Sequence, residues 1–312
     1  MRSIRRSRAM AHRGGRFMWA CARHFRRGRH SIARAFARAM ALAAGVAGGA
    51  AVAGAADAPP ARVVSMNVCT DQLLLLVADR AQIAALSPLA TNREMSALAA
   101  RAEGLAQTTG GAEDIYLRTP DLVLADVWSD PGTLAMLARL GVRVERFSPG
   151  VSVPDIRAKI TRMGEVLGQD ARAAAVLADF DARLAAIARP AQAPSAAVYG
   201  AGGYGYGPKT LEGQMLALAG FENLVSGPGL DWGGRLDLEA LVLAAPDLVI
   251  AGAPGASRAE EMLAHPALAG MRVERALRDA RWVCAAPAML GAVADLAAFG
   301  RRIEAEKAMA TQ

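Results

Sequence analysis

The sequence contains few of the residues that build transition-metal sites and catalytic centres. Its 312 residues include three cysteines and four histidines, and Cys21 and three of the histidines lie within the first 30 residues. The rest of the chain holds only Cys69, Cys284 and His265 of these two types. Because zinc and similar metals take several Cys or His ligands at one site, we expect no metal site built from protein ligands.

Acidic residues are absent from residues 1–56, which carry twelve arginines. The formal net charge of +7 therefore comes from this first segment. From Asp57 onward, 24 basic residues stand against 29 acidic ones, a net charge of −5. A nucleic-acid-binding protein needs a basic surface on its folded part, so we expect no nucleic-acid partner.

Long, strongly hydrophobic runs are also absent. The apolar run at residues 39–56 is made mostly of Ala, Gly and Val, follows basic residues and ends in small ones. Basic residues, a short apolar stretch and an exit of small residues make up a secretory signal, whereas a membrane span needs roughly 20 strongly apolar residues. We expect residues 1–57 to be a signal segment that directs export.

What the sequence does contain is a repeat. Residues 113–125 return as residues 239–251, and in both copies a Glu opens a short helical stretch, a Pro-Asp pair ends it and an apolar run follows. Two copies at half-protein spacing lie too far apart for a solenoid and predict two similar α/β lobes with a cleft. The alternative is that helix, Pro-Asp turn and strand form a unit common to any α/β protein.

Strand and helix patterns alternate on both sides of a long helical stretch. Seven apolar runs have the composition of strands: 62–69, 83–86, 122–127, 142–147, 196–199, 248–251 and 281–285. Between the two groups, apolar residues keep helical spacing, interrupted only near Gly168. We predict parallel sheets with covered faces. The expected domains are a signal segment (1–57), an N-terminal lobe (58–153), a connecting helix (154–190) and a C-terminal lobe (191–312).

Residues 62–73, the two Glu-x6-Pro-Asp-Leu-Val blocks and the central helical stretch together resemble the helical-backbone class of periplasmic substrate-binding proteins. These proteins serve ABC importers of ferric siderophores, haem and cobalamin, and the resemblance runs in order over roughly residues 60–305. It implies an α/β fold of two Rossmann-like lobes joined by one long rigid helix, with the ligand in the cleft between the lobes. We expect a periplasmic, monomeric binding protein that is no enzyme and needs no cofactor.

The resemblance also implies that one surface glutamate per lobe docks onto arginines of the ABC permease in the inner membrane. These glutamates map onto Glu113 and Glu239. Two carboxylates at matching places suit guanidinium groups on a pseudo-symmetric partner. For each glutamate taken alone, the competing explanation is a solvated helix N-terminus favoured by the helix dipole.

Ligands of open α/β sheets bind beyond the carboxyl ends of the strands, and the scarce aromatic residues of this chain gather in those loops. The candidate ligand-binding residues are Asn67, Thr70, Asp71, Trp128, Tyr204, Tyr206, Lys209, Trp232 and Arg235. Basic residues and tyrosines suit a ferric siderophore with anionic donors, whereas the tryptophans suit cobalamin. We expect a metal chelate, with a ferric-siderophore-type iron complex favoured and cobalamin as the alternative.

Two further function classes are weighed against this one. Residues 200–205 match G-x-G-x-x-G after a strand, the pattern of an exported nucleotide-dependent α/β enzyme. In that motif a helix opens at the third glycine, but here residues 206–209 intervene, so we interpret the segment as a cleft loop. An exported scaffold that binds only protein would lack a ligand pocket.

Cys69 and Cys284 each end an expected strand, so both are placed at the cleft ends of their sheets. In an oxidising compartment the two either form a disulfide that crosses the lobes or stay apart as separately buried thiols. The sequence leaves both possibilities open.

Overall fold

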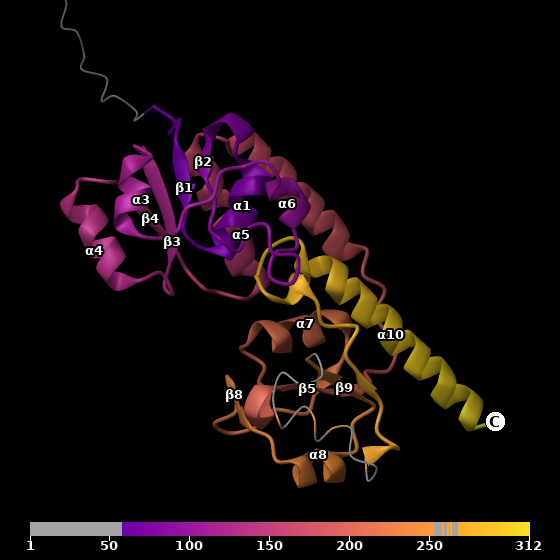
Figure 1. The fold of residues 1–312 in the computed structure, drawn as a ribbon. Coiled ribbons are helices and arrows are strands. Elements are labelled where there is room, and N and C mark those ends of the chain that lie inside the picture. Colours follow the sequence, from indigo (N-terminus) through magenta and orange to yellow (C-terminus); the bar gives the residue numbers. More distant parts are fainter. Residues whose placement is uncertain (1–57, 253–257, 259–260, 262, 264–267) are drawn as a thin grey trace, which may run out of the picture. The chain divides into compact units, whose positions relative to one another are not determined.

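The structure, a computed structural model, describes residues 58–312 except 253–257, 259–260, 262 and 264–267 (Figure 1). The predicted signal segment and His265 lie outside the described residues. The described residues belong to one compact unit that contains two separate sheets. Among the described helices, none has the length and apolar character needed to cross a membrane.

The N-terminal sheet is parallel, with strand order β2-β1-β3-β4. Its strands are β1 (Val63–Ser65), β2 (Ile83–Ala85), β3 (Leu122–Asp126) and β4 (Val144–Phe147). Its helices are α1 (Val68–Val77), η1 (Arg80–Gln82), α2 (Ala99–Ala102), α3 (Ala112–Leu117) and α4 (Pro131–Arg139). Because side chains alternate along a strand, Val63 packs in the core with α1, whereas Val64 packs with Ile115 of α3 and Leu137 of α4.

The C-terminal sheet has the order β10-β9-β5-β6-β8, and the short strand β7 also pairs with β5. Its strands are β5 (Ser195–Gly200), β6 (Tyr204–Tyr206), β7 (Glu222–Asn223), β8 (Gly233–Arg235), β9 (Leu248–Ala251) and β10 (Val273–Glu274). Its helices are η2 (Ala201–Gly203), α7 (Leu211–Ala219), α8 (Leu238–Ala244), η4 (Ala280–Trp282) and α10 (Met289–Ala310). The sheet is parallel except for β6 and β8, which run antiparallel to their neighbours.

The prediction of a single connecting helix at residues 154–190 is wrong, because this segment forms two helices, α5 (Val153–Leu167) and α6 (Asp170–Ala185). Gly168 ends α5 in the left-handed conformation, with φ 64°. The two helices then pack against each other, and a Cβ on Gly164 would lie 2.6 Å from the Cβ of Ala173. Both helices also pack on α1, so much of the expected connector belongs to the N-terminal lobe.

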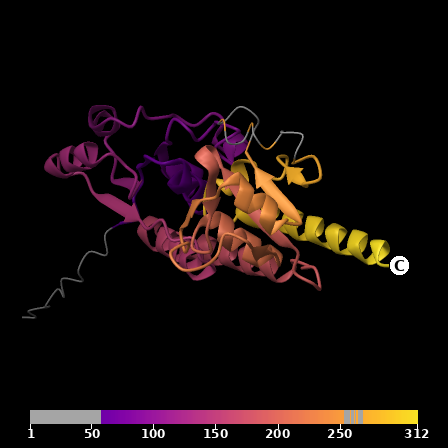
Figure 2. The ribbon, with the colours of Figure 1, turned by 90° about the horizontal axis from the view of Figure 1, so that it is seen from below.

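Helix α10 contacts both α6, which precedes the second sheet in the sequence, and α7, which belongs to the C-terminal lobe. From Ala305 its residues are exposed, and Figure 2 shows these last turns, in yellow, extending to the C-terminus. These exposed turns carry charged residues, among them Glu306 and Lys307.

Two predicted strand assignments need correction. Residues 281–285 form the end of η4 and bends, because Asp279 caps the turn by accepting from the Arg281 N–H at 2.8 Å. At the other end of the fold, Cys69 lies in α1 and not in a strand. The Asn67 side chain accepts from the Cys69 N–H at 2.7 Å and so starts the helix three residues before the expected cap at Thr70.

The repeated sequence forms the same backbone twice, which confirms the prediction of two similar α/β lobes. Thr119 and Ala245, the residues before each Pro-Asp pair, have φ of 47° and 43°, and among the described non-glycine residues they alone have positive φ. Asp121 accepts from the N–H of Arg62 at 2.9 Å, and Asp247 accepts from the N–H of Ser195 at 2.8 Å. Each aspartate therefore fixes the start of the first strand of its own lobe.

The repeat also includes a second segment of each lobe. Gly-Val-Arg-Val-Glu at residues 141–145 corresponds to Gly-Met-Arg-Val-Glu at residues 270–274. Val123 donates its N–H to the Arg143 carbonyl at 2.9 Å, and Val249 donates to the Arg272 carbonyl at 2.8 Å. The pairs β3–β4 and β9–β10 therefore share one register, which extends the likeness of the lobes beyond the helix and strand recognised from sequence.

Candidate functional site

The carboxyl end of β1 leads directly into α1, and only part of it is accessible. Asn67, the N-cap of α1, is partly exposed. Thr70 and Asp71 are buried: the Thr70 hydroxyl bonds Ser65 Oγ at 2.7 Å, and Asp71 accepts from the Ser87 N–H at 3.0 Å. Burial raises the pKa of Asp71 to about 6. In this structure neither side chain is accessible to a ligand, so the predicted contact role of these two residues gives way to a structural one.

Trp128 follows β3 and is 80% exposed. Asp126 positions it, since its carboxylate accepts from the Trp128 N–H at 2.9 Å and from Ser129 Oγ at 3.2 Å. This local turn directs the indole away from its own lobe. Packing against the lobe therefore does not account for the presence of this side chain.

The loop after β5 does not have the geometry of a dinucleotide-binding motif. The chain makes one 3-10 turn, with Gly202 and Gly203 at positive φ, and returns as the antiparallel strand β6. Helix α7 begins only at Leu211 after the N-cap Thr210. No helix N-terminus opens at the third glycine, so the phosphate-binding arrangement of the motif is missing from this described loop.

Strands β6 and β8 bring three of the predicted aromatic residues together. The Tyr204 hydroxyl donates to the Trp232 carbonyl at 2.7 Å, and the rings of Tyr204 and Tyr206 meet edge to face with centroids 5.2 Å apart. Trp232, just before β8, is 64% exposed. We call Tyr204, Tyr206 and Trp232 the aromatic hairpin. Tyr206 is half-buried, whereas the flat, exposed rings of Tyr204 and Trp232 suit a large, planar or apolar ligand.

The two predicted cations of this region are both ion-paired within the lobe. Lys209 Nζ lies 2.7 Å from an Asp231 carboxylate oxygen, and Arg235 Nε lies 2.6 Å from Asp237. All four side chains are exposed, so water and salt screen both pairs and they contribute little to stability. An anionic ligand would nevertheless have to replace a carboxylate at each cation.

Arg278 and Glu212 support the aromatic hairpin, and the sequence analysis missed both. The Arg278 guanidinium lies 5.1 Å from the Tyr206 ring centroid and 3.4 Å from a Glu212 carboxylate oxygen. Burial raises the pKa of Glu212, while the Arg278 charge opposes that shift. The contacts join residues 66 and 72 positions apart, a distance over which no local sequence pattern signals a pairing.

Cys69 and Cys284 are joined in a disulfide, with Cα atoms 5.3 Å apart. Next to it, Lys159 of α5 donates to the carbonyls of Gly150 at 2.8 Å and Ala285 at 2.9 Å. Burial lowers the pKa of Lys159 to about 8. The segment before α10 is thus held to the N-terminal lobe by one covalent bond and by a partly buried lysine that the sequence analysis did not identify.

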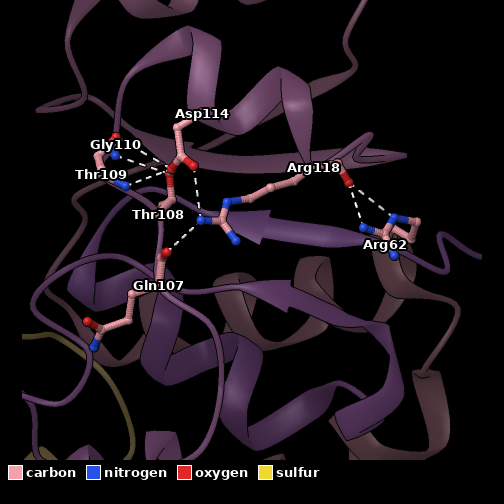
Figure 3. A network of polar contacts seen from close by, with 7 residues as sticks. All are labelled: Arg62, Gln107, Thr108, Thr109, Gly110, Asp114 and Arg118. Carbon is pink, nitrogen blue, oxygen red and sulfur yellow. Dashed lines mark hydrogen bonds and ion pairs between the residues drawn. The ribbon is translucent and has the colours of Figure 1, made fainter.

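Glu113 and Glu239 are both exposed in the first turn of their helices, α3 and α8. Figure 3 shows how neighbouring residues hold α3: Asp114 accepts from Thr108 Oγ1 at 2.6 Å, and Arg118 donates to Asp114 at 3.0 Å. These hydrogen bonds, with that from Thr108 the largest cause, lower the pKa of Asp114 to about 2. The lobe thus uses Asp114 and Arg118 to fix the helix and leaves Glu113 directed to solvent.

Three hollows of about 330, 390 and 290 Å³ occur on the described part of the chain, and none is lined by the predicted ligand-binding residues. The first lies beside α6, the second beside the end of α10 and the third beside the end of α8. Within the described residues, no group of three or more Cys, His, Asp or Glu is placed to hold a metal ion.

Comparison with known proteins identifies the family of this chain. Residues 63–278 match the family described as periplasmic binding protein. A cobalamin-binding protein of Halobacterium salinarum is 27% identical over 202 residues, which are 63% of this chain and 55% of that protein. The ferric enterobactin-binding periplasmic protein FepB of Escherichia coli is 30% identical over 117 residues, 35% of this chain and 37% of that protein. The chain thus spans about half the length, or less, of these curated relatives.

Solved structures show the same fold. The haem-binding protein RhuT from Roseiflexus sp. RS-1 superposes with a TM-score of 0.65 at 21% identity, covering 78% of this chain and 98% of that one. The vitamin B12 binding protein BtuF of Vibrio cholerae gives 0.56 at 15% identity, covering 79% and 98%. Because the family match covers more than two thirds of this chain, the chain belongs to the periplasmic binding protein family.

Proposed function

We propose that this protein is the ligand-capturing component of an ABC importer and that its ligand is cobalamin. Family membership supports the first part, since the family consists of binding proteins. The observation that carries the second is the combination of exposed tryptophans with cations that are already paired. Trp128 and Trp232 are exposed, whereas Lys209 and Arg235 each bond a carboxylate of their own lobe.

Ligand charge separates the candidates. Cobalamin carries amide side chains on its corrin ring and needs no cluster of free cations, so aromatic and backbone contacts suffice. A ferric siderophore or a haem with its two propionates favours cations free to bind an anion. The 27% identity with a cobalamin-binding protein over 63% of the chain supports the same choice.

A ferric siderophore is the second candidate, and it was the first expectation from sequence. The match to the ferric enterobactin-binding protein favours it. The exposed pairs at Lys209 and Arg235 are weak enough for a strongly anionic chelate to displace their carboxylates. Binding of this kind would weaken steeply with added salt, whereas cobalamin binding would change little.

Titration of the protein from residue 58 onward with cyanocobalamin, haemin and ferric enterobactin, followed by tryptophan fluorescence and calorimetry, decides between these ligands. This part of the chain has three tryptophans, and the third, Trp282, is buried. We expect cyanocobalamin to quench the wild-type signal. The variant W128A/W232A keeps Trp282 as a reference and should bind about 30-fold more weakly or worse. Salt-sensitive binding of ferric enterobactin alone would contradict the proposal.

Export is the remaining part of the proposed function. The charge break near Asp57 and the apolar run before it support cleavage of residues 1–57 and release into the periplasm. N-terminal sequencing of protein from an envelope fraction tests this, because an intact arginine-rich N-terminus on cytoplasmic protein would contradict it.

A further inference from the structure

We propose that each lobe contacts the permease through an apolar pair as well as through its glutamate. The pairs are Tyr116-Leu117 on α3 and Val242-Leu243 on α8, and with Glu113 and Glu239 they form what we call the two docking faces. This inference rests on the proposed function, since it concerns the same partner. It adds a contact chemistry that the charge of the glutamates does not supply.

The apolar pairs are exposed at matching positions of the repeat. Leu117 is 72% and Leu243 86% exposed, and Tyr116 and Val242 are exposed as well. The residue before each pair, Ile115 or Leu241, is buried in the core of its lobe. Each helix thus places one fully buried apolar residue in the core of its lobe and directs two more to solvent. Single exposed apolar residues are common, but a matched pair on each of two lobes needs a reason.

The glutamate and the leucine of each docking face lie side by side. They are four residues apart in both helices, Glu113 with Leu117 and Glu239 with Leu243, which puts them on one helix surface. A partner that pairs with the carboxylate therefore covers the leucine in the same contact.

The copies differ where their structural needs differ. In α3, Asp114 and Arg118 form an ion pair and bind the preceding loop, but the corresponding residues of α8 are alanines, Ala240 and Ala244. What the two helices have in common is the buried apolar residue, the outward glutamate and the outward apolar pair. The fold accounts for the first of these, whereas the other two point to a common external partner.

The chemistry of the docking faces selects that partner. Each presents a negative charge beside an apolar contact, so the partner surface must offer a cation beside an apolar recess, and must offer it twice. The two similar halves of a membrane permease provide such a repeated surface. A hollow of about 290 Å³ lined by Val242, Ala245, Pro246, Leu268, Gly270 and Met271 lies beside the α8 pair. It has room for an apolar side chain of the permease.

The test measures binding of the protein, incubated with cyanocobalamin, to its cognate permease in lipid nanodiscs across a range of salt concentrations. The variant L117S/L243S should bind roughly tenfold or more weakly, by a factor that is the same at low and high salt. The variant E113Q/E239Q should also weaken binding, but most at low salt, because screening already reduces the charge contribution at high salt. Different salt profiles of the two variants would identify two contact chemistries.

A matched control is L89S/M309S, which removes two exposed apolar side chains outside the repeat and should leave permease binding unchanged. Unchanged binding by L117S/L243S, with binding weakened by E113Q/E239Q, would overturn this inference and leave the proposed function standing. Failure of the wild-type protein to bind the permease would instead contradict the proposed function. A wild-type dimer that L117S/L243S converts to monomers in sedimentation would overturn the inference in favour of a second copy of the chain.

Discussion

The two lobes share the backbone of the repeat but differ at the carboxyl end of their first strand. In the N-terminal lobe, β1 passes through Asn67 directly into α1. In the C-terminal lobe, the η2 turn and β6 are inserted between β5 and α7, and β8 pairs with the insertion. This insertion carries the aromatic hairpin. The lobes are therefore alike on the proposed docking helices and different where we propose that the ligand binds.

That contrast separates two physical requirements on one chain, namely binding of the proposed permease and binding of the proposed ligand. A permease with similar halves would require the same contact twice, which we propose that the repeat on α3 and α8 supplies. A single asymmetric ligand requires different contacts from its two sides, and we propose that Trp128 on one lobe and the aromatic hairpin on the other supply them. Experiments that treat equivalent residues of the two lobes as pairs can test this division.

The largest expected effect is on transport. The double variant E113A/E239A should abolish uptake of cyanocobalamin while its affinity stays within a few-fold of wild type, since both carboxylates are directed to solvent. Loss of each charge pair is expected to cost about 2 kcal/mol or more of permease binding. The two single variants should reduce uptake equally. A large difference between them would show that the docking helices are not equivalent, and loss of ligand affinity would place the glutamates in the ligand site.

The second expected effect concerns the Cys69–Cys284 disulfide, which joins α1 of the N-terminal lobe to the segment before α10. The disulfide closes a loop of 215 residues, for which the chain-entropy model gives about 5 kcal/mol as an upper figure, and native disulfides typically contribute 2–5 kcal/mol. We expect C69A/C284A to lower the free energy of unfolding by about this range in urea titration. Thiol titration of the unfolded, unreduced protein from residue 58 onward should find no free thiol. Two free thiols would mean that the lobes are held by packing and Lys159 alone.

Sequence predicted the repeated part of the fold because its signals are local. The Pro-Asp pair and the apolar run of each strand, β3 or β9, can be recognised within a segment of 13 residues, as in residues 113–125. The strands β6 and β8 were missed since each is three residues long and glycine-rich, with Gly205, Gly233 and Gly234 in place of β-branched residues. The break in the connecting helix was seen at Gly168, but its consequence was not, because folding back depends on the close approach at Gly164.

The candidate site, like the fold, was predicted only where its signals are local in the sequence. The sequence pattern predicted Trp128, Tyr204 and Trp232 in loops at the ends of strands. The structure leaves all three exposed, but Tyr204 begins strand β6. Burial of Asp71 could not be predicted, because its partner Ser87 lies 16 residues away in the next loop. Arg278 follows a two-residue strand with no sequence signal. Residues whose role depends on a distant partner are the ones that sequence reasoning failed to place.

A third prediction compares the two aspartates of the repeat. Asp121 and Asp247 accept from backbone N–H groups at the start of β1 and β5, and replacement by Ala should cost about 1–3 kcal/mol of stability in urea unfolding. We expect D247A to cost more than D121A. Asp247 is partly buried and also pairs with Lys307 at 2.6 Å, whereas water can replace the exposed Asp121. The Asn variants keep an acceptor and should recover part of the loss. Equal costs would mean that the surroundings of the two turns do not matter.

The smallest expected effect concerns two acids in the first turns of the corresponding helices, the buried Asp71 in α1 and the half-buried Glu212 in α7. Burial raises the pKa of Asp71 from 3.8 to about 6, so between these pH values the folded state binds more protons than the unfolded chain. This residue's contribution to stability is therefore full below about pH 4 and is lost as the pH rises through 6. The pKa of Glu212 is raised in the same direction, and its contribution has the same sign.

The two lobes should nevertheless differ in how strongly they respond. Among the described residues, the hydrogen-bond partners of Asp71 are neutral hydroxyl and amide groups, whereas Glu212 has the Arg278 charge beside it. Urea unfolding of wild type, D71N and E212Q at several pH values between 4 and 7 measures the contrast. The stability of D71N relative to wild type should rise with pH up to about 6 and then level off. For E212Q the rise should be smaller, since Arg278 stabilises the ionised carboxylate and loses its partner in the variant. A D71N curve parallel to wild type throughout would contradict a buried Asp71 that titrates near pH 6, and a steeper response from E212Q would reverse the contrast between the lobes.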